Sequence, residues 1–213
     1  MKAHRVFDSL LTLDVVVWTA LIGGYVEHGV GDVVICYLKQ MFLNGISPSP
    51  ITLIFSLNAC NSSGAIDTSK QVHMDILKMG YESDLIAGNA LVGMYARCGS
   101  FIEACLVFDT LQVQYVVTWN ILISACINFG FEEAICCMEE MVLEGVLPNW
   151  ITYSCTLKCC SRLGAIERGC TIHIQAVKEG TDKDYTIGNV LLNLYAKYGS
   201  LSNARKVLNA MPS

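Results

Sequence analysis

The sequence predicts an all-α fold, an α-solenoid of tandem helix-turn-helix units. Three observations support this. A shift of 100 residues superposes the chain on itself, apolar residues recur at helical spacing, and a glycine follows most apolar segments. Paired helices of about 12 residues cannot bury their apolar faces alone, so neighbouring pairs have to stack. A row of stacked pairs is a solenoid.

The internal repeat divides the chain into units. Gly64-Ala65-Ile66 returns as Gly164-Ala165-Ile166, within 20 identities over the 60 positions of Pro50–Asp109. Each copy holds three units of about 35, 35 and 31 residues, and the second copy lacks one residue near Phe131, in a predicted turn. The predicted units are 1–14 (the second helix of a preceding unit), 15–49, 50–84, 85–115, 116–149, 150–184 and a truncated 185–213.

Two amphipathic helices are predicted in each unit. Leu91, Tyr95 and Ala96, for example, fall on one stripe of a helix. The predicted first helices are Val17–His28, Ile51–Ser62, Ile86–Arg97, Thr118–Phe129, Ile151–Leu163 and Thr186–Lys197. The second helices are predicted to begin near Asp32, Ile66, Phe101, Glu132, Ile166 and Leu201, and Ala3–Leu10 is the predicted helix of the partial unit.

Glycines mark the predicted helix ends. A glycine just past a helix can take the left-handed conformation without a steric penalty. Pro48 and Pro148 then prevent a second helix from continuing. The glycines in this position follow first helices at Gly29, Gly64, Gly99, Gly130, Gly164 and Gly199, and second helices at Gly45, Gly80, Gly145 and Gly180.

Composition excludes a disordered chain, because 53% of the residues are hydrophobic and only 15% are charged. The uncharged run Thr110–Phe131 is long enough to span a bilayer. It contains Gln112, Gln114 and Asn120, which are costly in lipid, so no membrane partner is expected. The net charge of −5 counts against a nucleic-acid partner, because phosphate binding usually needs a basic patch.

The cysteines and histidines are interpreted as packing residues. Adjacent pairs at Cys136–Cys137 and Cys159–Cys160 lie in apolar helical segments, which predicts reduced core side chains in a reducing compartment. Two metal sites are the alternatives, one formed by Cys155 with Cys159 and Cys160, the other by Cys170 with His173. Lys70 replaces Cys170 in the other copy, and His73 matches His173, so packing is the preferred interpretation and no metal or cofactor is expected.

No catalytic motif is present. The sequence has no Gly-rich phosphate loop, no G-x-S-x-G, and neither the His-x-Glu nor the Cys-x-x-Cys of zinc deaminases. An enzyme and a small-molecule substrate are therefore not expected.

Two segments, VVTWNILISACINFG at the start of Val116–Asn149 and NVLLNLYAKYGSLSNARKVLNAMP at Asn189–Pro212, resemble pentatricopeptide repeats. The unit lengths resemble the P, L and S repeats of the plant PLS subfamily. The resemblance implies a right-handed superhelix that binds single-stranded RNA in a mitochondrion or chloroplast, although no transit segment is visible. It implies a role in RNA processing, with C-to-U editing as the leading expectation and editing or processing factors supplied in trans as further partners.

The resemblance also implies residue roles. Each repeat is expected to meet one base, which is chosen by the fifth residue of the first helix and the last residue of the unit. These reading pairs are Thr19/Ser49, Ile54/Asp84, Asn89/Tyr115, Asn120/Asn149 and Ser154/Asp184, and Asn189 stands alone in the last unit. The second residues of the first helices, which are expected to sandwich the bases, are Val16, Ile51, Ile86, Val117, Ile151 and Thr186.

By the same resemblance Asn120/Asn149 favours a pyrimidine such as cytosine, and Ser154/Asp184 resembles a guanine reader. Ile54 and Tyr115 depart from the family pattern, so their units are expected to read no base sharply. The alternative role for an asparagine at a helix start is capping.

Candidates for phosphate neutralisation are Lys39, Lys70, Lys78, Arg97, Lys158, Arg162, Lys178 and Lys197. The competing function, favoured by the acidic charge, is a protein–protein interaction scaffold.

Overall fold

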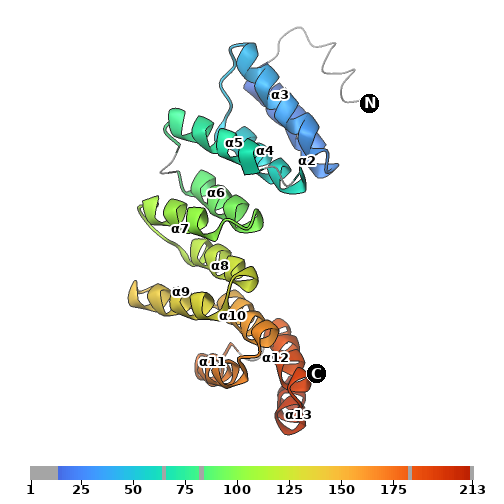
Figure 1. The fold of residues 1–213 in the computed structure, drawn as a ribbon, viewed down its shortest axis with the longest axis vertical. Coiled ribbons are helices and arrows are strands. Elements are labelled where there is room, and N and C mark those ends of the chain that lie inside the picture. The colour runs from blue at the N-terminus through green and yellow to red at the C-terminus, as the bar shows by residue number, and fades with distance from the viewer. Residues whose placement is uncertain (1–13, 64–65, 82–83, 182–183, 212–213) are drawn as a thin grey trace. The chain divides into compact units, whose positions relative to one another are not determined.

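The computed structural model describes residues 14–63, 66–81, 84–181 and 184–211 (Figure 1). Every element within these ranges is helical. The predicted helix Ala3–Leu10 and the turn at Gly64 lie outside the described residues. By its contacts the chain forms two compact units, which meet between Val113 and Gln114.

The first unit is a stack of three helical hairpins. Its helices are α2 (Val15–Glu27), α3 (Gly31–Leu43), α4 (Pro50–Ser63), α5 (Ile66–Lys78), α6 (Leu85–Arg97) and α7 (Phe101–Thr110). The first helices of the hairpins, α2, α4 and α6, pack successively against one another (Figure 1). Each of the second helices α3 and α5 packs against the first helix of its own hairpin and of the next.

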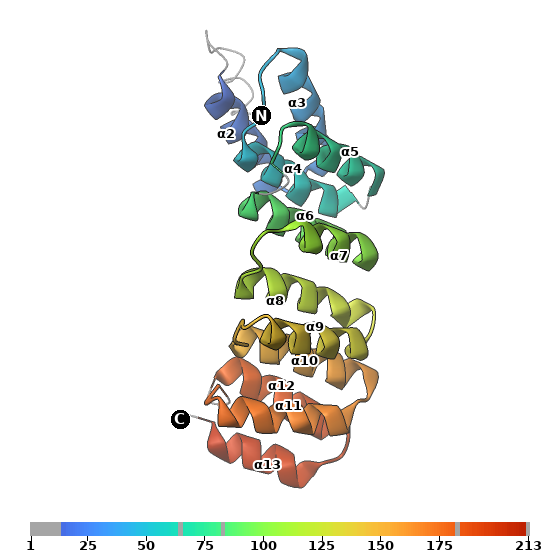
Figure 2. The same cartoon turned by 90° about the vertical axis from the view of Figure 1, so that its left-hand side faces the viewer.

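The second unit repeats this arrangement. Its helices are α8 (Val116–Ala125), the 3₁₀ turn η1 (Cys126–Asn128), α9 (Phe131–Leu143), α10 (Trp150–Leu163), α11 (Ile166–Lys178), α12 (Tyr185–Lys197) and α13 (Leu201–Ala210). Here α8, α10 and α12 are the first helices, and α10 packs against both of the others (Figure 2). In both units, therefore, first helices form one layer and second helices another.

The predicted helices are confirmed, with one correction at the fourth hairpin. The twelve α-helices of the described ranges all begin within two residues of the predicted positions. The expected helix Thr118–Phe129, however, ends as an α-helix at Ala125 and continues only as η1. Gly130 consequently has an extended backbone, with φ −179°, and is not a left-handed cap. The residue lost near Phe131 shortens this turn, which explains the difference from Gly29 and Gly99.

A tryptophan anchors the core of the first hairpin. Trp18 on α2 is 2% exposed, and its ring lies 6.3 Å from the ring of Tyr37 on α3. Leu21 and Ile22 pack in the same cluster. Burial of each such side chain contributes about 1.5–3 kcal/mol. Trp119 occupies the same register in α8 and is equally buried, so the repeat extends to the core.

A histidine–tyrosine hydrogen bond joins consecutive hairpins in each unit. The imidazole Nδ1 of His73 on α5 lies 2.8 Å from the hydroxyl of Tyr95 on α6, and His173 lies 2.9 Å from Tyr195. Burial lowers the pKa of His73, which favours the neutral ring. Among the described residues no group of three potential metal ligands is found.

The cysteine prediction needs one correction. Every cysteine whose side chain the structure describes is a free thiol. Cys159 and Cys160 are both buried, and burial raises the pKa of the two thiols to about 12 and about 11. Cys136 is exposed while Cys137 is buried, because neighbours in a helix point about 100° apart and α9 is covered on one side only. Cys36 is exposed as well.

The uncharged run Thr110–Phe131 is divided among α7, a turn, α8 and η1. Within the described ranges no helix is both long and apolar enough to cross a membrane.

Candidate nucleic-acid interface

The second residue of every first helix is exposed. These six residues are Val16, Ile51, Ile86, Val117, Ile151 and Thr186, and we call them the exposed row. The five apolar members range from 37% exposed at Ile151 to 68% at Val16. β-Branched aliphatic side chains are usually buried. Their recurrence at one register, on helices that pack side by side within each unit, makes this edge of each unit a candidate contact surface.

Polar reading pairs accompany the exposed row. The fifth residue of a first helix lies three positions after the second, so it projects from the same helix face. In the second unit the structure joins Asn120 on α8 to Asn149, the residue just before α10. Asn120 Nδ2 donates to Asn149 Oδ1 over 3.1 Å. The two members of this predicted pair are therefore in direct contact.

Asn149 also caps α10. Its Oδ1 accepts from the backbone N–H of Ile151 (3.0 Å) and of Thr152 (3.2 Å), and Thr152 completes a capping box. Because the capping oxygen faces the helix, the Nδ2 amino group of Asn149 faces away from it. Capping and base contact are thus compatible, since they use opposite ends of one amide.

A hydroxyl cluster replaces the amides in the first unit. Thr19 Oγ1 donates to the carbonyl oxygen of Val15 over 2.6 Å and lies 2.6 Å from Thr52 Oγ1. Ser49 Oγ lies 2.9 Å from the same Thr52 oxygen. The predicted pair Thr19/Ser49 is therefore bridged by Thr52, the third residue of α4.

The last residues of other units serve as caps too. Asp84 Oδ1 accepts from Ile86 N and Ala87 N, at 3.1 and 2.8 Å. Asp184 Oδ1 accepts from Thr186 N at 2.7 Å. Tyr115 precedes α8 without a side-chain cap bond. Asp14, which sequence reasoning did not select, caps α2 through Val16 N and Val17 N. Its position could have identified it, because Asp14 lies one unit length before Ser49, the last residue of the first full unit.

The fifth residues differ in exposure. Asn189 is exposed, whereas Asn120 is 7% and Ser154 only 2% exposed. Thr19, Ile54 and Asn89 are half-buried. Ser154 Oγ makes no hydrogen bond within the described part of the chain. The fifth residues of the second unit are therefore not equally accessible, because Ser154 lies beneath the surface and Asn189 is exposed.

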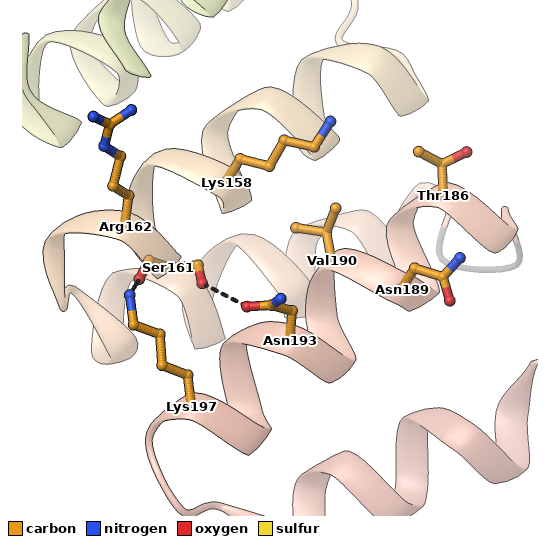
Figure 3. Close-up of a pocket in the computed structure, with 8 residues that line it drawn as sticks. All are labelled: Lys158, Ser161, Arg162, Thr186, Asn189, Val190, Asn193 and Lys197. Atoms are coloured by element: carbon orange, nitrogen blue, oxygen red, sulfur yellow. Dashed lines mark hydrogen bonds between the residues drawn. The ribbon is translucent and has the colours of Figure 1, made fainter. Parts of the chain in front are cut away.

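A basic groove runs between α10 and α12 (Figure 3). It encloses about 530 Å³, and its lining includes the predicted base contacts Thr186 and Asn189. Lys158 and Arg162 line it from α10 and Lys197 from α12, with no carboxylate among the lining residues. Lys197 Nζ donates to the carbonyl oxygen of Ser161 over 2.7 Å, which holds one cation at the groove.

Charge is divided between the two helix layers. The first helices carry four cationic side chains, Arg97, Lys158, Arg162 and Lys197, against a single carboxylate, Glu27. The second helices carry seven cationic side chains against ten carboxylates. Of the candidates for phosphate neutralisation, Lys39, Lys70, Lys78 and Lys178 lie on second helices. The acidic balance of the chain therefore comes mainly from its second helices, although Asp14, Asp84 and Asp184 cap first helices beside the exposed row.

Comparison with known proteins decides the family. The model described as PPR repeat family matches residues 115–162, and the model described as PPR repeat matches 16–46, 89–114 and 189–213. Together they cover more than half of the chain.

The chain belongs to the pentatricopeptide repeat family.

Relatives in Arabidopsis thaliana agree. One pentatricopeptide repeat-containing protein is 35% identical over all of this chain and 29% of its own length. A second, named chloroplastic, is 34% identical over 98% of the chain and 34% of its own length. A third, named mitochondrial, is 35% identical over 98% of the chain and 33% of its own length. The chain thus spans about a third of the length of these relatives.

Solved structures confirm the fold. The pentatricopeptide repeat protein PPR10 in complex with an 18-nt psaJ RNA element matches with a TM-score of 0.85 and 20% identity, over 97% of this chain and 31% of that one. A second crystal structure, of PPR10 from maize, matches with a TM-score of 0.76 and 22% identity, over 93% of this chain and 29% of that one. The fold is an all-α repeat solenoid.

Replacing Asn149 by alanine should destabilise α10. The substitution removes the cap oxygen from two backbone N–H groups, which costs about 1 kcal/mol. Tyr115→Ala is the matched control, because Tyr115 occupies the same place before α8 without a side-chain cap bond. Denaturant unfolding of both variants measures the difference. Equal stability of the two would show that the Asn149 amide does not cap.

Proposed function

We propose that this pentatricopeptide repeat chain binds single-stranded RNA along the edge of its first helices, one base per repeat. The observation that supports this most directly is the exposed row, in which an apolar β-branched side chain stands at the second position of five first helices and a threonine at the sixth. These side chains stay exposed after the helices of each unit have packed together.

The exposed row suits nucleobases. Apolar side chains on adjacent helices offer a base a contact on each of its two faces, and every base has such faces. Aliphatic side chains stack less strongly than aromatic ones. The affinity of this chain is therefore expected to be modest, with base identity decided by the reading pairs beside the row.

The basic groove suits the phosphate backbone. Lys158 and Arg162 line it from α10 and Lys197 from the adjacent first helix α12, and Thr186 and Asn189 line its other end (Figure 3). A nucleotide whose base met Asn189 would have its phosphate near these cations. Neutralised phosphates release counterions, so binding is expected to weaken as salt increases.

Base selection is expected to be sharpest at Asn120/Asn149. The Nδ2 group of Asn149 offers donors, and a pyrimidine presents the acceptor O2, with N3 as a second acceptor in cytosine. Ser154/Asp184 remains the proposed guanine reader, but Ser154 is buried, so its side chain has to move to reach a base. Ile54 leaves its unit without a polar fifth residue. Tyr115 places an aromatic side chain at the last position of the next unit.

The wider role follows from the relatives. PPR10 was crystallised with an RNA element, and relatives are named mitochondrial or chloroplastic. By analogy we propose that the chain is the recognition module of an organellar RNA-processing protein of the PLS type, with C-to-U editing as the specific role. Catalysis is assigned to factors supplied in trans, because the sequence contains no catalytic motif.

A protein–protein scaffold is the second candidate. Leu43 ends α3 and Leu143 ends α9, and their side chains are 86% and 84% exposed. Both stand on second helices, whose net charge is acidic. A protein partner would therefore be expected to use the second-helix layer, which leaves the first-helix edge available to RNA.

Asn120→Ala should abolish the base preference of its repeat. Removing the Asn120 amide deletes its hydrogen bond to Asn149 Oδ1, so the Asn149 amino group that is proposed to meet the base is held less firmly, at a cost to discrimination of about 1–3 kcal/mol. Selection from a pool of random short single-stranded RNAs measures it by sequencing the bound fraction. Asn203→Ala, on second helix α13, is the control. An unchanged preference in Asn120→Ala would remove the base-reading assignment.

The salt dependence should report the basic groove. A triple variant, Lys158→Ala with Arg162→Ala and Lys197→Ala, should lower the slope of log affinity against log salt by about 2, at about 0.7 per phosphate contact. The matched control removes Lys39, Lys70 and Lys178, which are exposed on second helices. A larger loss of slope in the control would place the phosphates on the other helix layer.

A further inference from the structure

We propose that the third residue of the following repeat, Thr52 or Thr152, is a positioning residue that fixes which hydrogen-bonding groups the preceding reading pair shows to a base. This inference rests on the proposed function, because a reading pair has meaning only if RNA is bound. Neither threonine was selected from the sequence, although Ile51-Thr52 and Ile151-Thr152 return at the 100-residue shift.

Thr152 orients the Asn120 amide of the second-unit pair, which in turn contacts Asn149. Its Oγ1 donates to Asn120 Oδ1 over 2.7 Å, and Asn120 Nδ2 donates in turn to Asn149 Oδ1 over 3.1 Å. Thr152 Oγ1 also accepts the backbone N–H of Asn149 over 3.1 Å. A threonine hydroxyl has one proton, and the shorter bond to Asn120 uses it. A flipped Asn120 would set its amino group against that donor, so the flip is disfavoured.

The consequence is a pair with a fixed donor side. Asn149 Oδ1 is occupied by two backbone N–H groups of α10 and by Asn120. Its amino group is then the end left for a base, and it can only donate. Without the Thr152 hydroxyl, the bond to Asn149 Oδ1 is the contact among the described residues that remains to orient the Asn120 amide, so the pair is held less firmly and discriminates less sharply between bases.

Thr52 organises the first-unit pair by a different route. Thr19 gives its single proton to the Val15 carbonyl, so in the contact between Thr19 and Thr52 the donor has to be Thr52. That leaves Ser49 as the donor in the contact between Ser49 and Thr52. The three hydroxyls thus form a directed chain, from Ser49 through Thr52 and Thr19 to Val15, whose protons are all in use.

The pairs Ile54/Asp84 and Ser154/Asp184 lack this bridge. At the equivalent place in the following first helix they have Ala87 and Ile187, neither of which carries a hydroxyl. Consistent with this, Ser154 Oγ is buried and makes no hydrogen bond among the described residues. A bridging threonine therefore distinguishes the Thr19/Ser49 and Asn120/Asn149 pairs from these two.

The test compares Thr52→Val and Thr152→Val in the full 213-residue chain. Valine keeps the branched shape and removes only the hydroxyl. Base preferences are read from the sequenced bound fraction of a random pool of short single-stranded RNAs. Thr152→Val should reduce the preference at the nucleotide assigned through Asn120→Ala by about five- to tenfold, the worth of one hydrogen bond. Thr52→Val should act instead about three nucleotides away, one per repeat.

Two controls separate positioning from stability. Thr152→Ser retains the hydroxyl and should retain the preference. Thr156→Val removes another fully buried hydroxyl from α10, one bonded to the carbonyl of Thr152, and should leave the preference unchanged at equal folded fraction. Loss of preference in Thr156→Val as large as in Thr152→Val, or an unchanged preference in Thr152→Val, overturns the inference.

The outcomes also separate this inference from the proposed function. If the wild-type chain binds RNA with a base preference that Asn120→Ala removes and Thr152→Val does not, only the role of the threonine is wrong. If the wild-type chain selects no RNA from the pool, the proposed function fails, and the inference fails with it.

Discussion

The structure depends on one constraint: a pair of short helices cannot bury its own apolar faces. Within each unit, first helices therefore pack against one another as well as against their partner helices, and Trp18 on α2 and Trp119 on α8 are buried in this packing. That packing leaves one face of each first helix exposed. The second residue lies on that face in the six first helices that the structure describes, and Thr19 and Asn120 contact residues at the start of the next first helix. The same stacking that stabilises each unit thus repeats an exposed second residue from one first helix to the next.

Charge follows the same division into layers. The net charge of −5 seemed to oppose a nucleic-acid partner, yet the carboxylates are concentrated on second helices and at helix starts. At the starts, Asp14, Asp84 and Asp184 are engaged as caps. The first helices retain four cationic side chains against one carboxylate. An average over the whole chain therefore hides a difference between its two faces.

The helices could be read from the sequence because the 100-residue repeat supplied two independent views of each pattern. The repeat pattern did not predict several local details. Where one residue is missing from the second copy, α8 ends early and continues as η1. Cys136 faces solvent although its neighbour Cys137 is buried. The reading pairs were placed by register, but the burial of Ser154 and the hydroxyl bridge through Thr152 depend on side-chain packing between helices about 30 residues apart. No pattern in a single helix encodes such contacts.

The central claim is that the exposed row is the surface that meets RNA. Binding of single-stranded RNA should be measured for a chain with Val117→Asp and Ile151→Asp, and for one with Leu143→Asp and Leu147→Asp. All four side chains are apolar and exposed in the same unit, but only the first two belong to the row. A carboxylate placed against a base and its phosphates should repel them, so the account predicts loss of binding in the first variant and wild-type binding in the second. Wild-type binding by the first variant would contradict it.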